Sequence, residues 1–372
     1  MNGRGVMIVA GEVSGDIHAG NMLEELRRID SEVRAFGVGG DRLTAAGLDL
    51  VARTEELAHM GLVEVLRELP RIRQVMHHLV EEARRRRPAV AVLVDSPDFN
   101  LRLAARLQKL GIPVVLYVSP QLWAWRRGRV RTVRRLAREV LCILPFEVAF
   151  YKAHGVRARY VGHPLVDEIH RVGLLDHPSE PQPGRLAMLP GSRAMEVRQL
   201  LPVMIQSLQS IAPADIDQAV LVEAPGMEAE VESILTEHGS DPRIRRVRGE
   251  ERRLELTGCE LAWTASGTAT LECTILGVPM VVGYRLQPVS YAIARLMVRV
   301  PNVALVNLIA GRTVVPELLQ NEWRPDNLSA VTSEMLEGGT AAQKVGLAEA
   351  RSRLGSPGAS RQAAEAVAEY LG

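Results

Sequence analysis

Residues 261–280, LAWTASGTATLECTILGVPM, limit the fold more than any other stretch of the chain. We expect an apolar strand over Leu261–Thr264, a turn of small residues, and a helix that begins at Gly267 or Thr268 and ends at Gly277. A strand that passes through a tight turn into a helix is typical of α/β proteins. Such a turn leaves free backbone N–H groups and the positive end of a helix dipole, which together bind anions.

Side chains around this turn fit a nucleotide. Ser266, Thr268 and Thr270 add hydroxyl donors, and Glu272 lies one turn into the helix, placed to accept hydrogen bonds from ribose hydroxyls. The structural alternative is that Ser266 caps the helix and Glu272 complements its dipole as a first-turn acid. Both interpretations stay open from this stretch alone.

Composition narrows the class of protein. A chain of 372 residues suits two domains, and the net charge of +1 argues against a bulk polyanion as partner. Cys142, Cys259 and Cys273 lack metal-site spacing and lie in apolar runs, so we expect buried, reduced thiols in a cytosolic protein. No run approaches the roughly 18 apolar residues of a membrane span. Any membrane contact is therefore expected to be peripheral.

The strand–turn–helix pattern also opens the chain. Gly5–Ala10 is a continuous apolar run, typical of a strand buried on both faces, and it leads into GEVSGD. Glu12 and Asp16 would repel a phosphate, so we expect this loop, with Ser14 and Gly15, to bind sugar hydroxyls or a protonated group. The alternative is that Ser14 and Asp16 only cap the following helix.

A second acidic loop, DSPDFN, follows the expected strand Ala89–Val94. The carboxyl ends of parallel strands are where α/β folds bind ligands. Asp98 is close to the start of the next helix, where it would either cap that helix or take a proton from an acceptor hydroxyl. Glu12, Asp16 and Asp95 are rival carboxylates for that proton.

Two further segments are candidates for contact with lipid. Glu56–Val80 is expected to be a helix with few polar positions over three turns, either crossing the core or offering an apolar face to a ligand or lipid. Its apolar residues include Met60, Leu62, Val63, Leu66 and Leu69.

The other segment places Trp123 and Trp125 directly before an arginine cluster over 126–138, which includes Arg126, Arg127 and Arg129. Such a group is typical of a nucleic-acid patch or of a membrane interface. The near-zero net charge favours the membrane or an anionic ligand over nucleic acid. Packing of both Trp side chains in the core is the structural alternative.

In the second half, strands and helices alternate again after a Pro- and Gly-rich linker. We divide the chain into 1–172, the linker 173–184, 185–345, and C-terminal helices over 346–372. The turn PGSR follows the strand Leu186–Leu189, and its Ser192 and Arg193 open a helix. Arg193 there would grip a diphosphate and stabilise a leaving UDP, the alternative being a surface arginine.

Two alternating β/α halves predict an α/β protein with two Rossmann-like domains, whose parallel sheets face a central cleft. The chain contains no P-loop, nucleophile elbow, zincin motif or CxxC pair. Chemistry is therefore expected from carboxylates, an arginine and helix N-termini, which suits sugar transfer from a nucleotide diphosphate without a bound metal or cofactor.

Taken together, the motifs resemble lipid-A-disaccharide synthase, a glycosyltransferase family, in order over nearly the whole chain. The matching segments are AGEVSGDIHAG (10–20), GVGG (37–40), MGLVEVL (60–66), DSPDFN (95–100), YVSPQLWAW (117–125), LPFE (144–147), VGHPLVD (161–167), LPGSR (189–193), ASGTATLE (265–272), PMVVGYR (279–285) and NLIAGR (307–312).

The resemblance implies a GT-B fold and an inverting, metal-independent transferase. The reaction would move 2,3-diacylglucosamine from UDP-2,3-diacylglucosamine to 2,3-diacylglucosamine 1-phosphate (lipid X), giving lipid A disaccharide 1-phosphate and UDP. The enzyme would lie in the cytoplasm, peripherally associated with the cytoplasmic face of the inner membrane. A homo-oligomer is compatible with the sequence.

The resemblance also implies roles for single residues. Arg193, with Ser192 and the Ser266–Thr268 turn, would hold the diphosphate, and Glu272 the ribose. Asp98 would be the general base. Further residues would line the donor side (Asn307 and Arg312), the acceptor side (Glu12, Ser14, Gly15 and Asp16), and acyl chains or membrane (the 60–69 segment and Trp123, Trp125 and their arginines).

Two other classes stay open at this point. A UDP-sugar epimerase shares the two-domain architecture and the UDP turn, but it needs neither the apolar helix nor the Trp–Arg segment. A non-catalytic binder of membrane or nucleic acid through the arginine cluster leaves the two-domain organisation unexplained.

Overall fold

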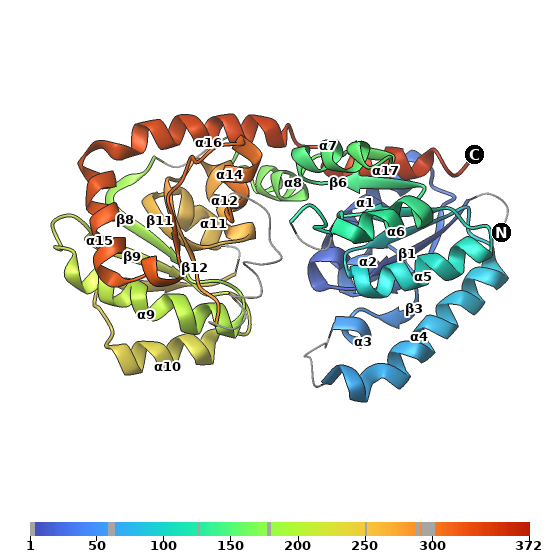
Figure 1. The fold of residues 1–372 in the computed structure, drawn as a ribbon, viewed down its shortest axis with the longest axis horizontal. Coiled ribbons are helices and arrows are strands. Elements are labelled where there is room, and N and C mark those ends of the chain that lie inside the picture. The colour runs from blue at the N-terminus through green and yellow to red at the C-terminus, as the bar shows by residue number, and fades with distance from the viewer. Residues whose placement is uncertain are drawn as a thin grey trace. The chain divides into compact units, whose positions relative to one another are not determined.

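The computed structural model describes residues 4–58, 64–124, 127–176, 180–249, 251–287, 291 and 302–372, with the side chains of 58, 64–69 and 127 outside the description. The chain forms two compact units (Figure 1). Unit 1 contains Met1–Asp167 and Ser356–Gly372, and unit 2 contains Glu168–Gly355.

Unit 1 is built on a parallel seven-stranded sheet with the order β3-β2-β1-β4-β5-β6-β7. Its strands are β1 (Gly5–Ala10), β2 (Arg34–Gly39), β3 (Asp49–Arg53), β4 (Val90–Val94), β5 (Val114–Tyr117), β6 (Glu139–Cys142) and β7 (Ala158–Tyr160). Its helices are α1 (Val13–Ile29), α2 (Asp41–Ala45), α3 (Glu55–Ala58), α4 (Glu64–Arg86), α5 (Pro97–Lys109), α6 (Val130–Leu136), α7 (Pro145–Ala153) and α17 (Ala359–Ala368), with the short 3₁₀ turn η1 (Arg127–Arg129) before α6.

The alternation of side chains along β1 shows how both faces of this sheet are covered. Met7 and Val9 pack in one core with α4, α5 and α6, whereas Val6 and Ile8 pack in a second core with α1 and α17. Successive strand residues point to opposite faces, so a strand buried on both faces reads as a continuous apolar run. β1 is therefore a continuous apolar run because helices cover both faces of the sheet.

Unit 2 repeats the design with a parallel six-stranded sheet in the order β10-β9-β8-β11-β12-β13. Its strands are β8 (Gln182–Leu189), β9 (Gln218–Val222), β10 (Ile244–Val247), β11 (Cys259–Ala265), β12 (Met280–Tyr284) and β13 (Glu317–Leu319). Its helices are α9 (Ala194–Ser210), α10 (Glu228–His238), α11 (Glu251–Thr257), α12 (Thr268–Leu276), α14 (Leu305–Ala310), α15 (Pro325–Glu334) and α16 (Thr340–Leu354), with short turns η2 (Gln320–Glu322) and η3 (Met335–Gly339).

The strand order of each unit reverses once, and the reversal marks where a ligand fits. In unit 1 the reversal lies between β1 and β4, and in unit 2 between β8 and β11. Loops that leave neighbouring strands at such a point run in opposite directions and open a crevice at the carboxyl ends of the strands. The two acidic loops of the first half and the two small-residue turns of the second half all lie at these points.

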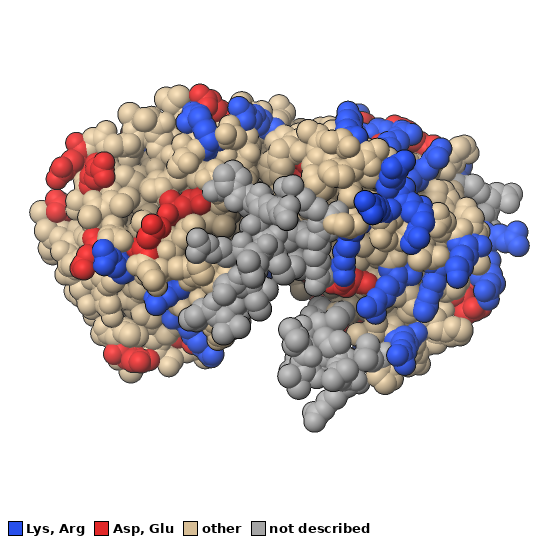
Figure 2. Space-filling model, viewed as in Figure 1, with Lys and Arg blue, Asp and Glu red and all other residues tan. Residues whose placement is uncertain are grey.

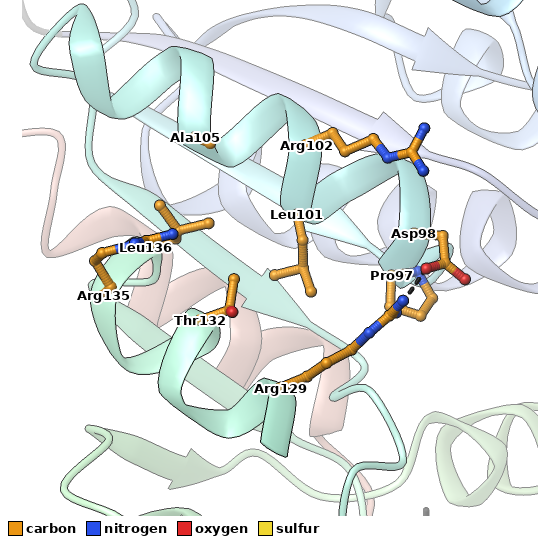
Figure 3. A pocket seen from close by; sticks show the side chains of 9 residues that line it. All are labelled: Pro97, Asp98, Leu101, Arg102, Ala105, Arg129, Thr132, Arg135 and Leu136. Carbon is orange, nitrogen blue, oxygen red and sulfur yellow. Dashed lines mark ion pairs between the residues drawn. The ribbon is translucent and has the colours of Figure 1, made fainter. Parts of the chain in front are cut away.

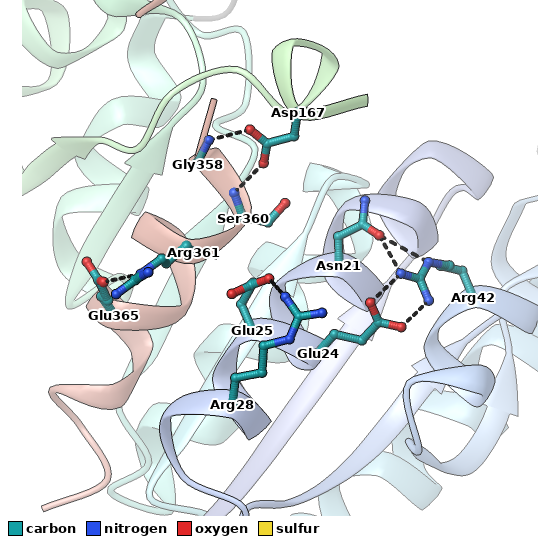
Figure 4. A network of polar contacts seen from close by, with 10 residues as sticks. All are labelled: Asn21, Glu24, Glu25, Arg28, Arg42, Asp167, Gly358, Ser360, Arg361 and Glu365. Atoms are coloured by element: carbon teal, nitrogen blue, oxygen red, sulfur yellow. Dashed lines mark hydrogen bonds and ion pairs between the residues drawn. The ribbon is translucent and has the colours of Figure 1, made fainter. Parts of the chain in front are cut away.

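The boundary between the units lies inside α8 (Pro164–Arg171), and the last residues of the chain return to unit 1. Asp167 stabilises this return, because its carboxylate accepts hydrogen bonds from the backbone N–H groups of Gly358, Ala359 and Ser360 at the start of α17. Figure 4 shows the bonds from Gly358 and Ser360. The sequence division had set 346–372 apart and ended the first domain at 172. The alanines of α17 pack into the core of α1, which joins that helix to unit 1.

Two edge strands, β3 and β13, have no counterpart in the sequence prediction. Edge strands are short and partly exposed, so the apolar pattern that identifies a central strand is weak in them. The predicted helix over 56–80 corresponds to α3 and α4, with residues 59–63 outside the description.

Candidate active site

The turn predicted after β11 has the expected form. Gly267 precedes α12 with φ +148°, a conformation that L side chains rarely adopt, and a Cβ atom there would meet nothing within 4 Å. The backbone conformation therefore requires glycine at position 267, and the space that a Cβ atom would occupy there is open to a ligand. Ser266 is partly buried, and its Oγ donates to the Val303 carbonyl at 2.9 Å; Thr268 is exposed at the first helical position.

The neighbouring β8 turn places Arg193 at the same edge of the sheet. Arg193 is the N-cap residue of α9, and its side chain is 81% exposed although Nη1 donates to Oε1 of Glu196 at 3.0 Å. The other oxygen of Glu196 accepts from the Ser192 N–H at 3.1 Å, which closes the turn. Exposed pairs of this kind contribute little free energy, so Arg193 is free to exchange its partner for a phosphate.

Tyr284, at the end of β12, belongs to the same edge and was not predicted. Burial raises the pKa of its hydroxyl, the Glu196 carboxylate raises it further, and Arg193 lowers it. The sequence signal that could have identified Tyr284 is its position at the end of β12, the strand next to β11.

Glu272 is buried on α12 and held by arginines of α11. Its Oε1 atom accepts from Nε of Arg253 at 2.8 Å and from Nη2 of Arg252 at 3.3 Å. Arg253 also donates to Glu168 at 2.7 Å. Among the described residues Oε2 of Glu272 has no hydrogen-bond partner, which leaves one carboxylate oxygen for a hydroxyl.

The two other expected donor residues have partners within unit 2. Asn307 is fully buried: Oδ1 accepts from the N–H groups of Val314 and Val315, and Nδ2 donates to Val315 and Glu317. All of its side-chain hydrogen-bonding capacity is used in bridging α14 to the segment before β13, so it does not face a ligand here. Arg312 is half-exposed and pairs with Glu349 of α16 at 2.6 Å.

The reversal point of unit 1 brings the β4 loop against the β1 loop. Asp95 and Ser96 have φ of +53° and +39°, and such non-glycine residues are strained by about 1–3 kcal/mol each. Gly15 lets the loops meet, because a Cβ atom there would lie 2.7 Å from Oδ2 of Asp95. That oxygen is buried with no described partner, and burial together with the charge of Glu12 raises the pKa of Asp95 to about 7.

Asp16 does not line an acceptor site, contrary to the expectation. It is 5% exposed, and its carboxylate accepts hydrogen bonds from the backbone N–H groups of Gly40, Arg42 and Leu43. It therefore caps the neighbouring helix α2, not its own helix, a possibility that local sequence does not reveal. Glu12, the N-cap residue of α1, and Ser14, in the first turn of that helix, are exposed and remain candidates.

Asp98 lies on the first turn of α5 with its side chain 61% exposed, and its Oδ1 atom lies 2.6 Å from Nη1 of Arg129. Both residues line a surface groove between α5 and α6 (Figure 3). An accessible carboxylate held by an arginine at the carboxyl edge of a sheet fits a group that meets a substrate hydroxyl.

Trp123 is a core residue and not a membrane contact, contrary to the expectation. It is 7% exposed, its Nε1 donates to Oε1 of Glu147 at 3.0 Å, and its ring meets Phe146 edge-on at 4.8 Å. Burial raises the pKa of Glu147 to about 7. The LPFE motif thus provides the partner for the buried indole.

The remaining residues expected to contact lipid are not placed. Met60, Leu62, Val63, Trp125 and Arg126 lie outside the described residues, as do the side chains of Leu66, Leu69 and Arg127. No helix in the described part of the chain has the length and apolar character of a membrane span. Over the same part, no three His, Cys, Asp or Glu side chains are grouped to hold a metal ion. The three cysteines are buried and free, as predicted.

A model of the lipid-A-disaccharide synthetase family matches residues 6–370. The chain belongs to this family.

Curated relatives agree with the match. A lipid-A-disaccharide synthase of Anaeromyxobacter sp. (strain K) is 46% identical over 374 residues, covering 97% of this chain and 96% of the relative. One of Myxococcus xanthus (strain DK1622) is 44% identical over 381 residues, covering 98% and 97%. As a member of the lipid-A-disaccharide synthetase family, the chain is a glycosyltransferase that forms the lipid A disaccharide from a UDP-sugar donor and a lipid acceptor. The epimerase and the non-catalytic binder are not favoured.

Solved structures confirm the fold. The glycotransferase of kitacinnamycin has a TM-score of 0.67 at 16% identity, covering 99% of both chains. A putative UDP-N-acetylglucosamine 2-epimerase from Listeria monocytogenes has a TM-score of 0.65 at 14% identity, covering 96% of this chain and 94% of that one. With two parallel Rossmann-like sheets, these likenesses confirm the predicted GT-B fold of the synthetase. The facing of the sheets across a cleft stays a prediction.

Proposed function

We propose that the chain transfers 2,3-diacylglucosamine from UDP-2,3-diacylglucosamine to lipid X by direct displacement, and that the turns after β8 and β11 hold the UDP. The observation that carries the proposal is the open turn at Gly267 beside the exposed guanidinium of Arg193, at the strand reversal of unit 2. Backbone N–H groups at the start of α12 and a bidentate arginine are suited to a diphosphate.

The other donor contacts follow from the same edge of unit 2. Oε2 of Glu272 would accept from the ribose, while Arg253 holds Oε1 and fixes the carboxylate. Ser192 and Thr268 lie at the two turns and would add hydroxyl donors to the phosphates. Arg312 would contact the donor only after breaking its ion pair with Glu349.

In the proposed reaction the 6-hydroxyl oxygen of lipid X attacks the anomeric carbon of the donor, and the bond from that carbon to the β-phosphate oxygen breaks. The proton of the hydroxyl passes to the carboxylate of Asp98, and UDP leaves with the electron pair. Arg193 and the α12 dipole stabilise the charge that develops on the phosphate. Attack from the opposite face inverts the donor carbon and gives a β-1,6 linkage.

We further propose that the enzyme works at the cytoplasmic face of the inner membrane as a peripheral protein, since both substrates carry acyl chains. The apolar 60–69 segment and the Trp125–Arg127 segment are the proposed contacts. The arginine-rich face over α5 and α6, seen in Figure 2, would add attraction to anionic headgroups.

The function is tested by UDP release from UDP-2,3-diacylglucosamine in detergent micelles, with and without lipid X, and with EDTA. Release that requires lipid X and persists in EDTA supports a metal-independent transferase with this acceptor. Release without lipid X would indicate hydrolysis of the donor instead of transfer. Abolition by EDTA, restored by a divalent cation, would contradict the metal-independent step.

A further inference from the structure

The groove between α5 and α6 has an apolar floor and basic sides. It encloses about 260 Å³, with Leu101, Ala105 and Leu136 among its lining residues and Arg102, Arg129 and Arg135 among its charged ones. Figure 3 shows the Asp98–Arg129 pair at one end and Arg135 with Leu136 at the other. A groove of this composition suits a molecule with both an anionic group and apolar chains.

Charge in and around the groove is unbalanced. Arg129 has Asp98 as partner, but no described carboxylate lies within ion-pair distance of Arg102 or Arg135. Asp98 is the only acid in the sequences of α5 and α6, which also contain the exposed basic residues Arg102, Arg106, Lys109, Arg131, Arg134 and Arg135. Arginine guanidinium groups bind phosphate bidentately, so the two arginines without carboxylates favour a phosphate ligand.

The position of the groove further limits which ligand it would bind. One end is formed by Pro97 and Asp98, directly after the β4 loop at the strand reversal of unit 1. A ligand with its reacting hydroxyl at Asp98 can extend its phosphate and acyl portions along the groove. The acceptor has all three groups: a 6-hydroxyl, a 1-phosphate and acyl chains.

We propose that this groove is the acceptor subsite, in which Arg135, at the end away from Asp98, binds the 1-phosphate of the acyl-sugar acceptor. Arg102, on the Asp98 side, adds positive charge, and Leu101, Ala105 and Leu136 contact the acyl portion. The inference rests on the proposed function and adds residues that set the enzyme's preference for a phosphorylated acceptor. A membrane phospholipid has the same phosphate-and-acyl chemistry. The acceptor is favoured because Asp98 closes one end of the groove.

The test compares R102Q/R135Q with R106Q/K109Q, which removes the same charge from exposed positions of α5 that do not line the groove. Initial rates are measured in nonionic detergent without phospholipid. The acceptors are lipid X and its analogue without the 1-phosphate. R102Q/R135Q is expected to raise the KM for lipid X about tenfold or more, since hydrogen bonds to charged groups are the stronger ones. Its KM for the UDP donor, which also reports folding, should stay unchanged.

The phosphate-free analogue gives the sharper readout. Wild type and R106Q/K109Q should prefer lipid X over the analogue, and R102Q/R135Q should lose that preference. An unchanged KM for lipid X in R102Q/R135Q, or an equal rise in R106Q/K109Q, would overturn the proposal.

A vesicle arm separates the two sources of phosphate. Sedimentation with phosphatidylglycerol-containing vesicles should give similar binding for both double variants. Loss of vesicle binding by R102Q/R135Q with a normal KM for lipid X would assign the groove to membrane phospholipid and overturn the proposal. If the wild-type enzyme shows no turnover that depends on lipid X, both the proposed function and this inference are wrong. Normal wild-type turnover with an unchanged variant KM overturns the inference alone.

Discussion

The Nε atom of Arg253 lies 2.8 Å from Oε1 of Glu272, and Nη2 of the same guanidinium lies 2.7 Å from Oε2 of Glu168. The three side chains are 15%, 10% and 18% exposed, so solvent screens these pairs only weakly. Glu168 is the first residue of unit 2 after the chain leaves unit 1. Arg253 is therefore a positioning residue, which orients the acid proposed to bind ribose.

Arg253→Lys is expected to raise the KM for the UDP donor several-fold with little change in kcat, because the charge stays but the fork that holds both carboxylates is lost. Arg252→Lys is the matched control, since Arg252 is more exposed and lies 3.3 Å from Glu272. Steady-state kinetics with the donor varied make the comparison. Equal donor KM values for the two variants would deny Arg253 its positioning role.

Asp98→Asn is expected to lower kcat by ~10²–10⁴-fold, the usual contribution of a general base, while UDP affinity stays normal. Asp95→Asn should retain turnover within about tenfold of wild type, because Oδ2 of Asp95 is buried whereas the carboxylate of Asp98 is accessible. Single-turnover rates and UDP titrations of both variants decide between the two carboxylates. A larger loss in Asp95→Asn than in Asp98→Asn would move the base to Asp95.

Asp95 also predicts a pH dependence of stability. Its pKa is raised from 3.8 to about 7, mainly by burial, so between those values the unfolded chain releases a proton that the folded chain keeps. The contribution of Asp95 to the free energy of unfolding therefore falls as pH rises through this window, and its loss is complete above about pH 7. Asn tolerates the left-handed backbone at this position.

Asp95→Asn is accordingly expected to be more stable than wild type at pH 8, and to approach the wild-type value near about pH 4. Urea unfolding at a series of pH values measures the difference. A difference that does not change with pH would show that Asp95 does not titrate in this window.

Asp16→Asn should destabilise the protein by about 1–3 kcal/mol, because the buried carboxylate accepts three backbone hydrogen bonds at the start of α2. Its KM for the acceptor should stay close to wild type. Thermal unfolding and acceptor kinetics are the two measurements. A raised acceptor KM with normal stability would return Asp16 to the acceptor site.

The parts of the fold that the sequence predicts are those set by local pattern. Buried parallel strands such as Gly5–Ala10 are continuous apolar runs because helices cover both faces, and the turn at Gly267 needs a residue that tolerates φ +148°. The turns after β8 and β11, which are proposed to bind the donor, were predicted for the same reason: a strand, small residues and a helix follow one another directly along the chain.

What the sequence does not reveal depends on partners distant along the chain. Asp16 caps a helix that begins 25 positions later, and Trp123 is satisfied by Glu147. Asn307 is held by the segment before β13, and α17 joins unit 1 through Asp167. Each polar side chain has several plausible partners in the sequence, and only the packed structure selects one.

The claim that most needs a direct test is that the turns after β8 and β11 hold the diphosphate. Calorimetric titration should show that the affinity for UDP falls about tenfold or more in both Arg193→Gln and Gly267→Ala. Arg193→Gln removes a bidentate partner of the diphosphate. Gly267→Ala strains the backbone at φ +148° and puts a methyl group into the open space of the turn. Arg198→Gln, an exposed position on the same helix that pairs with Glu230, should bind UDP like wild type. Wild-type UDP affinity in both Arg193→Gln and Gly267→Ala would contradict the account.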